Sequence, residues 1–356
     1  MEYSINADLH NHTTGSDGKQ SPLMFLLRAK NRGRKVVSIT DHSSIKGYKQ
    51  LEKQIRYYAK KSLNEKNVIT AKRLLNVLDS LNLMTGVEVI TSYKGIIIEI
   101  HGYDIDIDKL NAKLQEKSKE LEPVNKVLYE GLNKGITNTG ITFNRDVLEN
   151  VDEDRLLWVF YEELMSHEEN RRIFGNITNV DTLKKFIYNY LYNPKSPFFV
   201  DMSSTRPTIQ DVIQCIHEAG GKAVLAHPVR YNQLDMRKEI DEIIKLGLDG
   251  LEVYYPDQNK EYREFLLQKV IEYGLISTGG SDDHRNYKEG KQYRMGIIDL
   301  PDAEETKWIK ETRNFLDENE EISDFRKKLR VMVDSSPNSK SKSSNVKRNE
   351  QRSEER

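Results

Sequence analysis

What the sequence has little of already narrows its class. It contains one cysteine, Cys215, which excludes an internal disulfide framework and is typical of a reducing compartment. Cys215 lies in an apolar segment, 212–216, and this favours a buried, inert thiol over a catalytic one. No apolar run approaches the about 20 residues of a membrane-spanning helix, and no basic segment followed by an apolar run opens the chain. We therefore expect a cytoplasmic protein that does not contact a membrane.

The chain also lacks an excess of positive or negative charge. The formal net charge is −1, so the chain as a whole has no attraction for nucleic acid or for anionic lipid. Apolar residues are nearly absent from the segment 335–356, which cannot bury enough surface to offset the entropy of ordering. We expect a disordered, solvated tail there, with contact to nucleic acid or an acidic partner through its Lys and Arg residues as the alternative.

Short apolar or β-branched runs alternate with helical patterns over most of the chain. Strands are predicted at 5–10, 36–40, 85–90, 96–102, 223–227, 250–254 and 275–278, with a further one at 295–300. Helices are predicted at 21–32, 51–63, 71–81, 107–132, 209–219, 236–246 and 259–273. This alternation indicates an α/β fold with parallel strands and crossover helices.

Two stretches interrupt the alternation. Residues 46–83 hold one or two charged helices, and residues 138–207 are mostly helical and rich in aromatic side chains. We predict one domain over 1–334, in which 138–207 is a helical insertion that forms a cap or a subdomain over the barrel mouth, followed by the tail. The insertion contains Tyr188, Tyr190 and Tyr192, which are expected to pack in its interior, with base stacking as the alternative.

The chemistry of the chain is concentrated at the predicted strand ends. Six of the eight histidines fall there, together with several carboxylates; the candidates are His10, His12, Asp17, Asp41, His42, Glu88, His101, His227, Asp282 and His284. His10 and His12 are two residues apart on a strand and therefore share a face, as two ligands of one metal would. Imidazole and carboxylate are usual ligands of Zn, Mn and Fe, and strand ends are where a barrel enzyme gathers its site. The pattern predicts a metal-dependent hydrolase.

Arg230 and Glu99 also lie near these strand ends. Arg230 follows His227 closely, and its planar guanidinium suits a phosphate oxygen. Glu99 shares a strand face with His101, but we expect it to face solvent or to orient a ligand. The two remaining histidines, His167 and His217, lie on predicted helices and are expected to be structural or exposed.

Seven segments carry a resemblance to a known family. They are ADLHNHTTGSDG (7–18), VVSITDH (36–42), GVEV (86–89), IHGYDID (100–106), AGGKAVLAHPVRY (219–231), GLDGLEVYYP (247–256) and STGGSDDH (277–284). In order and spacing they resemble the polymerase-and-histidinol-phosphatase (PHP) superfamily, in its branch of small metal-dependent phosphoesterases. The resemblance implies a distorted (β/α)7 barrel that holds two to three divalent metal ions, Mn, Fe or Zn.

The resemblance also implies how the ligands divide. His10, His12, Glu88 and Asp282 match one metal site; Asp17, His42 and His284 match a second; Glu88, His101 and His227 match a third, with Glu88 bridging. Closely spaced metals of this kind generate a hydroxide near neutral pH and clamp the attacked phosphate. Arg230 matches a catalytic, phosphate-binding arginine, and Asp41 matches a group that orients a ligand or handles a proton.

The chain departs from the family in one place. Relatives carry a Thr-Arg-Thr-His-like segment with a second phosphate-binding arginine, where this chain reads ITNTGIT (136–142). Arg145 or Arg206 is a candidate substitute. The segment before the Ala-His-Pro motif is also longer than in relatives, so the substrate is the least determined part of the prediction.

Four functions follow in order of preference. The first is a phosphoesterase that acts on a nucleotide or on the 5′ end of a short oligonucleotide such as RNA. The second is a phosphatase of a small metabolite such as histidinol phosphate. The third is a non-catalytic PHP module, disfavoured because every matched ligand is present. The fourth is a general amidohydrolase barrel, disfavoured by the Thr-Asp-His and Asp-x-His motifs.

Overall fold

The computed structural model describes residues 4–148, 151, 155–170, 183, 185–285 and 294–336. Its centre is a seven-stranded sheet whose strands are neighbours in sequence order. The strands are β1 (Ala7–Asp8), β2 (Val36–Ile39), β3 (Asn82–Tyr93), β4 (Ile96–Tyr103), β5 (Lys222–Leu225), β6 (Gly250–Tyr254) and β7 (Ile276–Gly279). The Leu9 N–H donates to the Gly279 carbonyl at 3.1 Å, which brings the two edges together. The result is a nearly closed, distorted (β/α)7 barrel, as predicted.

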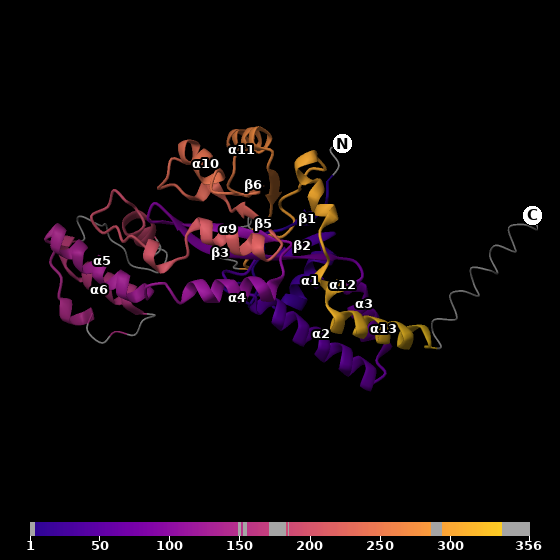
Figure 1. The fold of residues 1–356 in the computed structure, drawn as a ribbon. Helices are drawn as coiled ribbons and strands as arrows, with labels where there is room; N and C mark the ends of the chain where they lie inside the picture. Colours follow the sequence, from indigo (N-terminus) through magenta and orange to yellow (C-terminus); the bar gives the residue numbers. More distant parts are fainter. Residues whose placement is uncertain are drawn as a thin grey trace, which may run out of the picture.

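The helices cover the outside of the barrel because the strands are apolar on both faces. All residues of β2 and β6 are buried, as expected for strands with helices behind them. The connecting helices are α1 (Pro22–Asn31), α2 (Lys46–Asn64), α3 (Val68–Leu78), α4 (Ile107–Ser118), α9 (Ile209–Glu218), α10 (Met236–Ile244) and α11 (Lys260–Tyr273). After β7 come η6 (Glu304–Glu311), α12 (Phe315–Glu318) and α13 (Glu320–Asp334), and α13 packs on α2 and α3 (Figure 1).

The prediction that all strands are parallel was wrong for β4. It pairs antiparallel with both β3 and β5, whereas the other pairs are parallel. Only Lys94 and Gly95 separate β3 from β4, and both have positive φ, of 51° and 80°. Two such residues make a tight hairpin, and a parallel connection would need a dozen residues or more. The hairpin places Glu88 directly opposite His101 in the register of the two strands.

A second hydrophobic cluster lies outside the barrel core. It consists of buried residues between positions 128 and 202, from α5 (Val124–Thr139), α6 (Leu156–Ser166) and the segment around η3 (Ile187–Leu191). Figure 1 shows α5 and α6 at one end of the molecule, on the opposite side from α13. This cluster contains Phe160, Tyr161, Phe186 and Phe198 of the predicted insertion, and its packing already begins in α5. The insertion as a separate helical unit stays a proposal.

Two element predictions were wrong in detail. The helix expected at 107–132 is two helices, α4 and α5, because Pro123 disfavours helical geometry in the residue before it and lacks an N–H donor. The strand expected at 295–300 is a turn followed by extended chain. Its Leu300 carbonyl accepts one hydrogen bond from the Ile5 N–H, at 3.0 Å, but no ladder follows.

Three other expectations concern single features. Cys215 is buried on α9, as predicted. Among the described residues, no helix is long and apolar enough to cross a bilayer. The predicted disordered tail, 335–356, lies outside the described residues from 337 onward.

Candidate metal centre

The barrel delivers the predicted ligands to one end. His10 and His12 follow β1, His42 follows β2, His227 follows β5, and Asp282 and His284 follow β7. Side chains after parallel strands meet at the carboxyl edge of the sheet, which is the usual place of a barrel active site. Glu88 and His101 join them from the interiors of β3 and β4. All nine predicted metal ligands therefore lie in one cluster.

Glu88 is the centre of this cluster. It is 1% exposed and lies within 3.3 Å of the ring nitrogens of five histidines. Its Oε1 atom faces the Nε2 atoms of His101 and His227, at 3.3 and 3.0 Å. Its Oε2 atom faces His12 Nε2 at 3.3 Å and His42 Nδ1 at 3.1 Å. A carboxylate with both oxygens engaged from two sides has the geometry of a bridging ligand.

The first predicted ligand set comes together on the β1 side. The Nε2 atoms of His10 and His12 each lie 3.3 Å from Asp282 Oδ1, and each also contacts Glu88 at 3.3 Å. Asp282 adopts a left-handed conformation, with φ 53°, which is uncommon for a residue other than glycine. Strained backbone of this kind concentrates at functional sites, where the surrounding structure holds it in place.

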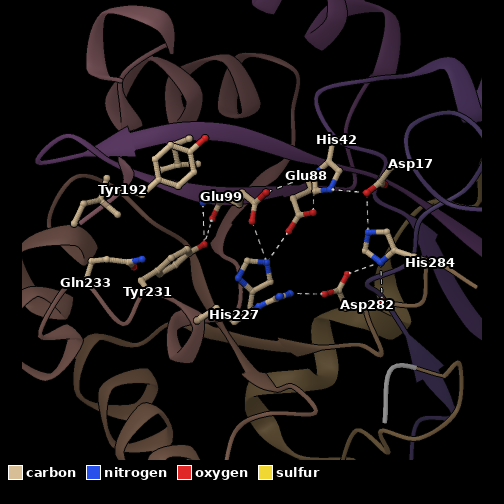
Figure 2. A pocket seen from close by; sticks show the side chains of 13 residues that line it. Asp17, His42, Glu88, Glu99, Tyr192, His227, Tyr231, Gln233, Asp282 and His284 are labelled. Carbon is tan, nitrogen blue, oxygen red and sulfur yellow. Dashed lines mark hydrogen bonds and ion pairs between the residues drawn. The ribbon is translucent and has the colours of Figure 1, made fainter. Parts of the chain in front are cut away.

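The second and third sets also converge. Asp17 Oδ2 lies 3.2 Å from His284 Nε2 and 3.7 Å from His42 Nε2, with His12 on the same side. His101 and His227 approach Glu88 from β4 and β5. Figure 2 shows Asp17, His42 and His284 on one flank of Glu88 and His227 on the other. The groups of potential metal ligands include His10, His12 and Asp282 together, and His42 with Asp17 and His284, whereas His101 and His227 fall in separate groups that each contain His10.

The donor atoms of this cluster fit divalent metals. The Nε2 atoms of His10, His12 and His101 and the Oε2 atom of Glu88 are buried and have no hydrogen-bond partner among the described residues. Buried polar atoms normally have one, so four of them facing one another require another kind of partner. Imidazole nitrogens mixed with carboxylate oxygens are the ligands that Mn, Fe and Zn accept. The residues present therefore fit the metals that the fold implies.

Two neighbours fix the ring orientations of the histidines. Glu252, on β6, is fully buried, and its Oε1 lies 2.9 Å from His10 Nδ1 while its Oε2 accepts from the His227 N–H at 2.7 Å. The Tyr103 hydroxyl lies 3.0 Å from His101 Nδ1. Each leaves the Nε2 atom of its histidine pointing at Glu88, as the outer partners of metal-ligating histidines do. Sequence reasoning missed Glu252, although a carboxylate inside an apolar strand was the same signal that identified Glu88.

Glu99 belongs to the site and does not simply face solvent. Its Oε2 lies 3.2 Å from His227 Nε2, its Oε1 lies 3.5 Å from His42 Nδ1, and its side chain is 19% exposed. With His42 and Glu88 it forms a further group of potential metal ligands. The sequence predicts that Glu99 shares a strand face with His101. It does not predict that His42 approaches Glu99 from the end of another strand.

Asp41 is fully buried and is not among the described residues that line the cavity. Its oxygens accept from the Thr13 N–H and hydroxyl, both at 2.7 Å, and from the Ser16 hydroxyl at 2.8 Å. A Cβ on Gly15 would lie 2.2 Å from Asp41 Oδ2, so the loop can close on the carboxylate only with glycine there. The geometry gives Asp41 the task of holding the loop that presents Asp17, and a direct proton-handling role lacks support.

Arg230 lies at the cavity, as predicted. Its guanidinium donates to the Tyr255 hydroxyl at 3.0 Å and to Asp282 Oδ2 at 3.1 Å, and its side chain is 38% exposed. The two suggested substitutes for the missing family arginine are elsewhere. Arg145 donates to the Thr137 hydroxyl at 2.7 Å, and neither it nor Arg206 is among the described residues that line the cavity. Neither suggestion finds support in the cavity lining, and Arg230 is the one arginine among its described residues.

The other two histidines are remote, as expected. His167 contacts Glu163 at 2.8 Å, and His217 contacts Asp249 at 2.7 Å.

The charges of the residues around Glu88 shift one another's pKa values. Burial disfavours the charged forms of His42 and His227, but hydrogen bonds and charge from Glu88 outweigh it and raise their pKa values to about 9 and about 10. Burial also opposes charging of His284, yet Asp17 raises its pKa to about 9.

Comparison with known proteins supports this interpretation. No protein-family model matches the chain. The chain is 28% identical over 279 residues to a 5′-3′ exoribonuclease of Haemophilus influenzae, covering 78% of this chain and 89% of the relative. It is 25% identical over 291 residues to a 3′,5′-nucleoside bisphosphate phosphatase of Chromobacterium violaceum, covering 80% and 90%. A crystal structure from Bifidobacterium adolescentis, described as a metal-dependent phosphoesterase, has the same fold, with a TM-score of 0.51, 20% identity and coverage of 85% and 94%.

Barrel, donor set and relatives together define a metal-dependent phosphoesterase. In its relatives and in its fold the chain is similar to the phosphoesterase branch of the polymerase-and-histidinol-phosphatase superfamily.

Proposed function

We propose that this protein hydrolyses phosphate esters of nucleotides or of the 5′ ends of short oligonucleotides, with two to three divalent metal ions held by the Glu88 cluster. The observation that carries the proposal is the position of Arg230 in the same cavity as the bridging carboxylate. A guanidinium beside a metal-ligand cluster offers a forked donor to an oxyanion, as a phosphate ester requires. The named activities of the two relatives, on RNA and on nucleoside bisphosphates, support the same substrate class.

The ligand assignment follows the contacts. His10, His12 and Asp282 would hold one metal, Asp17, His42 and His284 a second, and His101 and His227 a third, with Glu88 between them. The donor set suits Mn, Fe or Zn. When bound, such metals supply activation of the nucleophile and neutralise charge on the attacked phosphate. Glu99, between His42 and His227, is placed to join this set.

The chain's own residues orient the substrate. Arg230 binds a phosphate oxygen, and the Tyr255 hydroxyl, which donates to Asp282 Oδ2 at 2.8 Å, keeps Asp282 in place when the arginine turns to the substrate. Glu252 holds the ring of His10 and the backbone of His227. The cavity, of about 440 Å³, is large enough for a small phosphorylated molecule.

A phosphate-release screen tests the proposal. The purified protein is incubated with Mn²⁺ and a panel of nucleoside mono- and bisphosphates, short 5′-phosphorylated RNAs, histidinol phosphate and sugar phosphates. We expect turnover of nucleotides or RNA that is lost on chelation and in Glu88→Gln, but retained in Glu264→Gln, whose carboxylate is exposed and does not line the cavity. Turnover of histidinol phosphate alone would support the metabolite phosphatase instead, and no turnover of any ester would support the non-catalytic module.

A further inference from the structure

The cavity that Glu88 and its neighbouring histidines line has a second, chemically different end. Its residues on the cluster side are charged or are imidazoles, whereas those on the other side are Ile96, Ile97, Tyr192, Tyr231 and Gln233. Figure 2 shows Tyr192, Tyr231 and Gln233 gathered on the side of Glu99 and His227 that faces away from Asp17 and His284. We call these five residues the aromatic end. None of them is a predicted metal ligand, so this end has another purpose.

One strand connects the two ends. Ile97, Glu99 and His101 are two residues apart along β4 and therefore point to the same face. At about 3.4 Å per residue, Ile97 lies about 14 Å from His101 along the strand. A substrate whose phosphate lies at the metal cluster must therefore extend past Glu99 to reach the aromatic end. A nucleoside attached to the phosphate extends in this way, since the pentose separates the phosphate from the base.

Tyr231 is a rigidly held part of the aromatic end. It is 6% exposed, and its hydroxyl accepts a hydrogen bond from the Glu99 N–H at 2.9 Å. Its ring centroid lies 5.6 Å from that of His227. Tyr231 contacts both β4 and His227, a predicted metal ligand. These contacts fix the distance between its ring and the predicted metal ligands.

Tyr192 closes the aromatic end from the helical region outside the barrel. Among the described residues of 124–206, it is the one that lines the cavity. Its N–H donates to the Ile187 carbonyl at 3.0 Å, and the preceding Leu191 is fully buried in the second hydrophobic cluster. Tyr192 is therefore presented to the cavity by a packed element, and its ring is half-buried and reachable by a ligand.

We propose that the aromatic end is a nucleobase subsite in which the base stacks on Tyr192, and that Tyr192 determines specificity for nucleosides over other phosphorylated molecules. The proposal rests on the proposed phosphoesterase function. A base offers flat apolar faces to Tyr192 and Ile97 and polar edges to the Gln233 amide, which can both donate and accept. A sugar would instead place hydroxyls against isoleucine side chains, where they lose hydrogen bonds to water without replacement.

The same geometry predicts weak selection among bases. Stacking accepts every base because each has a π-face. Purines and pyrimidines should therefore differ little, while removal of the base should matter greatly.

The test compares substrates with and without a base. With Mn²⁺, kcat and KM are measured for adenosine 3′,5′-bisphosphate, adenosine 5′-monophosphate and ribose 5-phosphate in the wild type, Tyr192→Leu and Tyr192→Phe. We expect the wild type to prefer a nucleotide, and Tyr192→Leu to raise KM for that nucleotide by about 5- to 100-fold, as the loss of one stacked base predicts. Tyr192→Phe keeps the ring and should behave as the wild type. Tyr129→Leu, at an exposed tyrosine of α5, is the matched control and should leave all constants unchanged.

Each outcome decides the question. A loss confined to the nucleotides, with kcat/KM for ribose 5-phosphate unchanged, supports the subsite. An equal loss on all three substrates would show a structural role of Tyr192 and overturn it, as would a wild type that hydrolyses ribose 5-phosphate as efficiently as nucleotides. A wild type that hydrolyses other phosphate esters but no nucleotide overturns the proposed substrate class itself, which separates the failure of the proposed function from that of the subsite.

Discussion

The Nε2 atom of His227 lies 3.0 Å from Oε1 of Glu88, although 139 residues separate the two along the chain. This contact links the β5 end of the cluster to the carboxylate that faces four further histidines. Glu88 therefore contacts ligands of all three predicted metal sets.

Glu252→Gln should weaken metal binding without unfolding the barrel. Glutamine keeps the shape of the side chain but replaces one acceptor oxygen with a donor, so it cannot satisfy both His10 Nδ1 and the His227 N–H. We expect Mn²⁺ affinity to fall by about 10- to 100-fold, the usual cost of losing an outer partner of a ligating histidine. Isothermal titration of the metal-free protein measures this, and an affinity equal to the wild type would contradict the role.

Asp41→Asn separates loop positioning from proton handling. Asn retains one acceptor, so at least one of the buried donors from Thr13 and Ser16 loses its partner, at about 1–3 kcal/mol of unfolding free energy. We expect metal content to fall, because the loop presents Asp17, while the pH profile of the remaining activity keeps its shape. If the metal content is unchanged and the activity no longer falls on one side of its pH optimum, the result would instead support the proton-handling role.

Arg230→Ala should lower kcat/KM by about 10- to 100-fold, the value of one or two hydrogen bonds to a charged oxyanion. The loss should fall mainly on KM for a phosphate ester, with metal content near that of the wild type. Arg237→Ala is the control, since Arg237 pairs with Glu261 at the surface. Equal kinetics in both variants would remove Arg230 from substrate binding.

The metal-free protein should lose stability as the pH rises above neutrality. The pKa values of His42 and His284 are raised to about 9, and that of His227 to about 10, from an ordinary 6.5. A raised folded-state pKa stabilises the fold fully below pH 6.5, and this stability is lost as the pH passes through 9 and 10.

Metals bind the deprotonated ligands, so they compete with these protons and bind more tightly at high pH. Thermal unfolding with and without Mn²⁺ should therefore show a larger increase in Tm near pH 9 than at pH 6.5. His42→Gln should reduce the difference, whereas His217→Gln, at a surface pair with Asp249, should not. A Tm increase independent of pH would contradict the coupling.

The barrel and most of the cluster could be predicted from the sequence because strand ends carry their own signal. Polar residues such as Glu88 stand out inside apolar strands, and spacing alone places His10 and His12 on one face. The antiparallel direction of β4 was missed although Lys94-Gly95, a two-residue connection between strands, indicates a hairpin. That error did not displace His101, because strand direction does not change which side chains share a face.

What could not be predicted depends on contacts between distant segments. Glu99 joins the site because His42 arrives from β2, and nothing near Glu99 in sequence indicates this. Tyr192 reaches the cavity through the packing of a helical region that has no counterpart in the strand pattern. Arg145 and Arg206 were candidates because the expected arginine is absent at 136–142, and neither is among the described residues that line the cavity.

The closure of the barrel has a consequence for synthesis of the protein. Leu9 pairs with Gly279, and His10 contacts Glu252, 242 residues further along the chain. A growing polypeptide therefore cannot complete its ligand set until the last strand and the Asp282 loop have left the ribosome. Metal binding therefore requires that the first and last strands of the barrel have paired. A chain truncated before Asp282 would be unable to assemble the first metal site, even if its earlier segments fold.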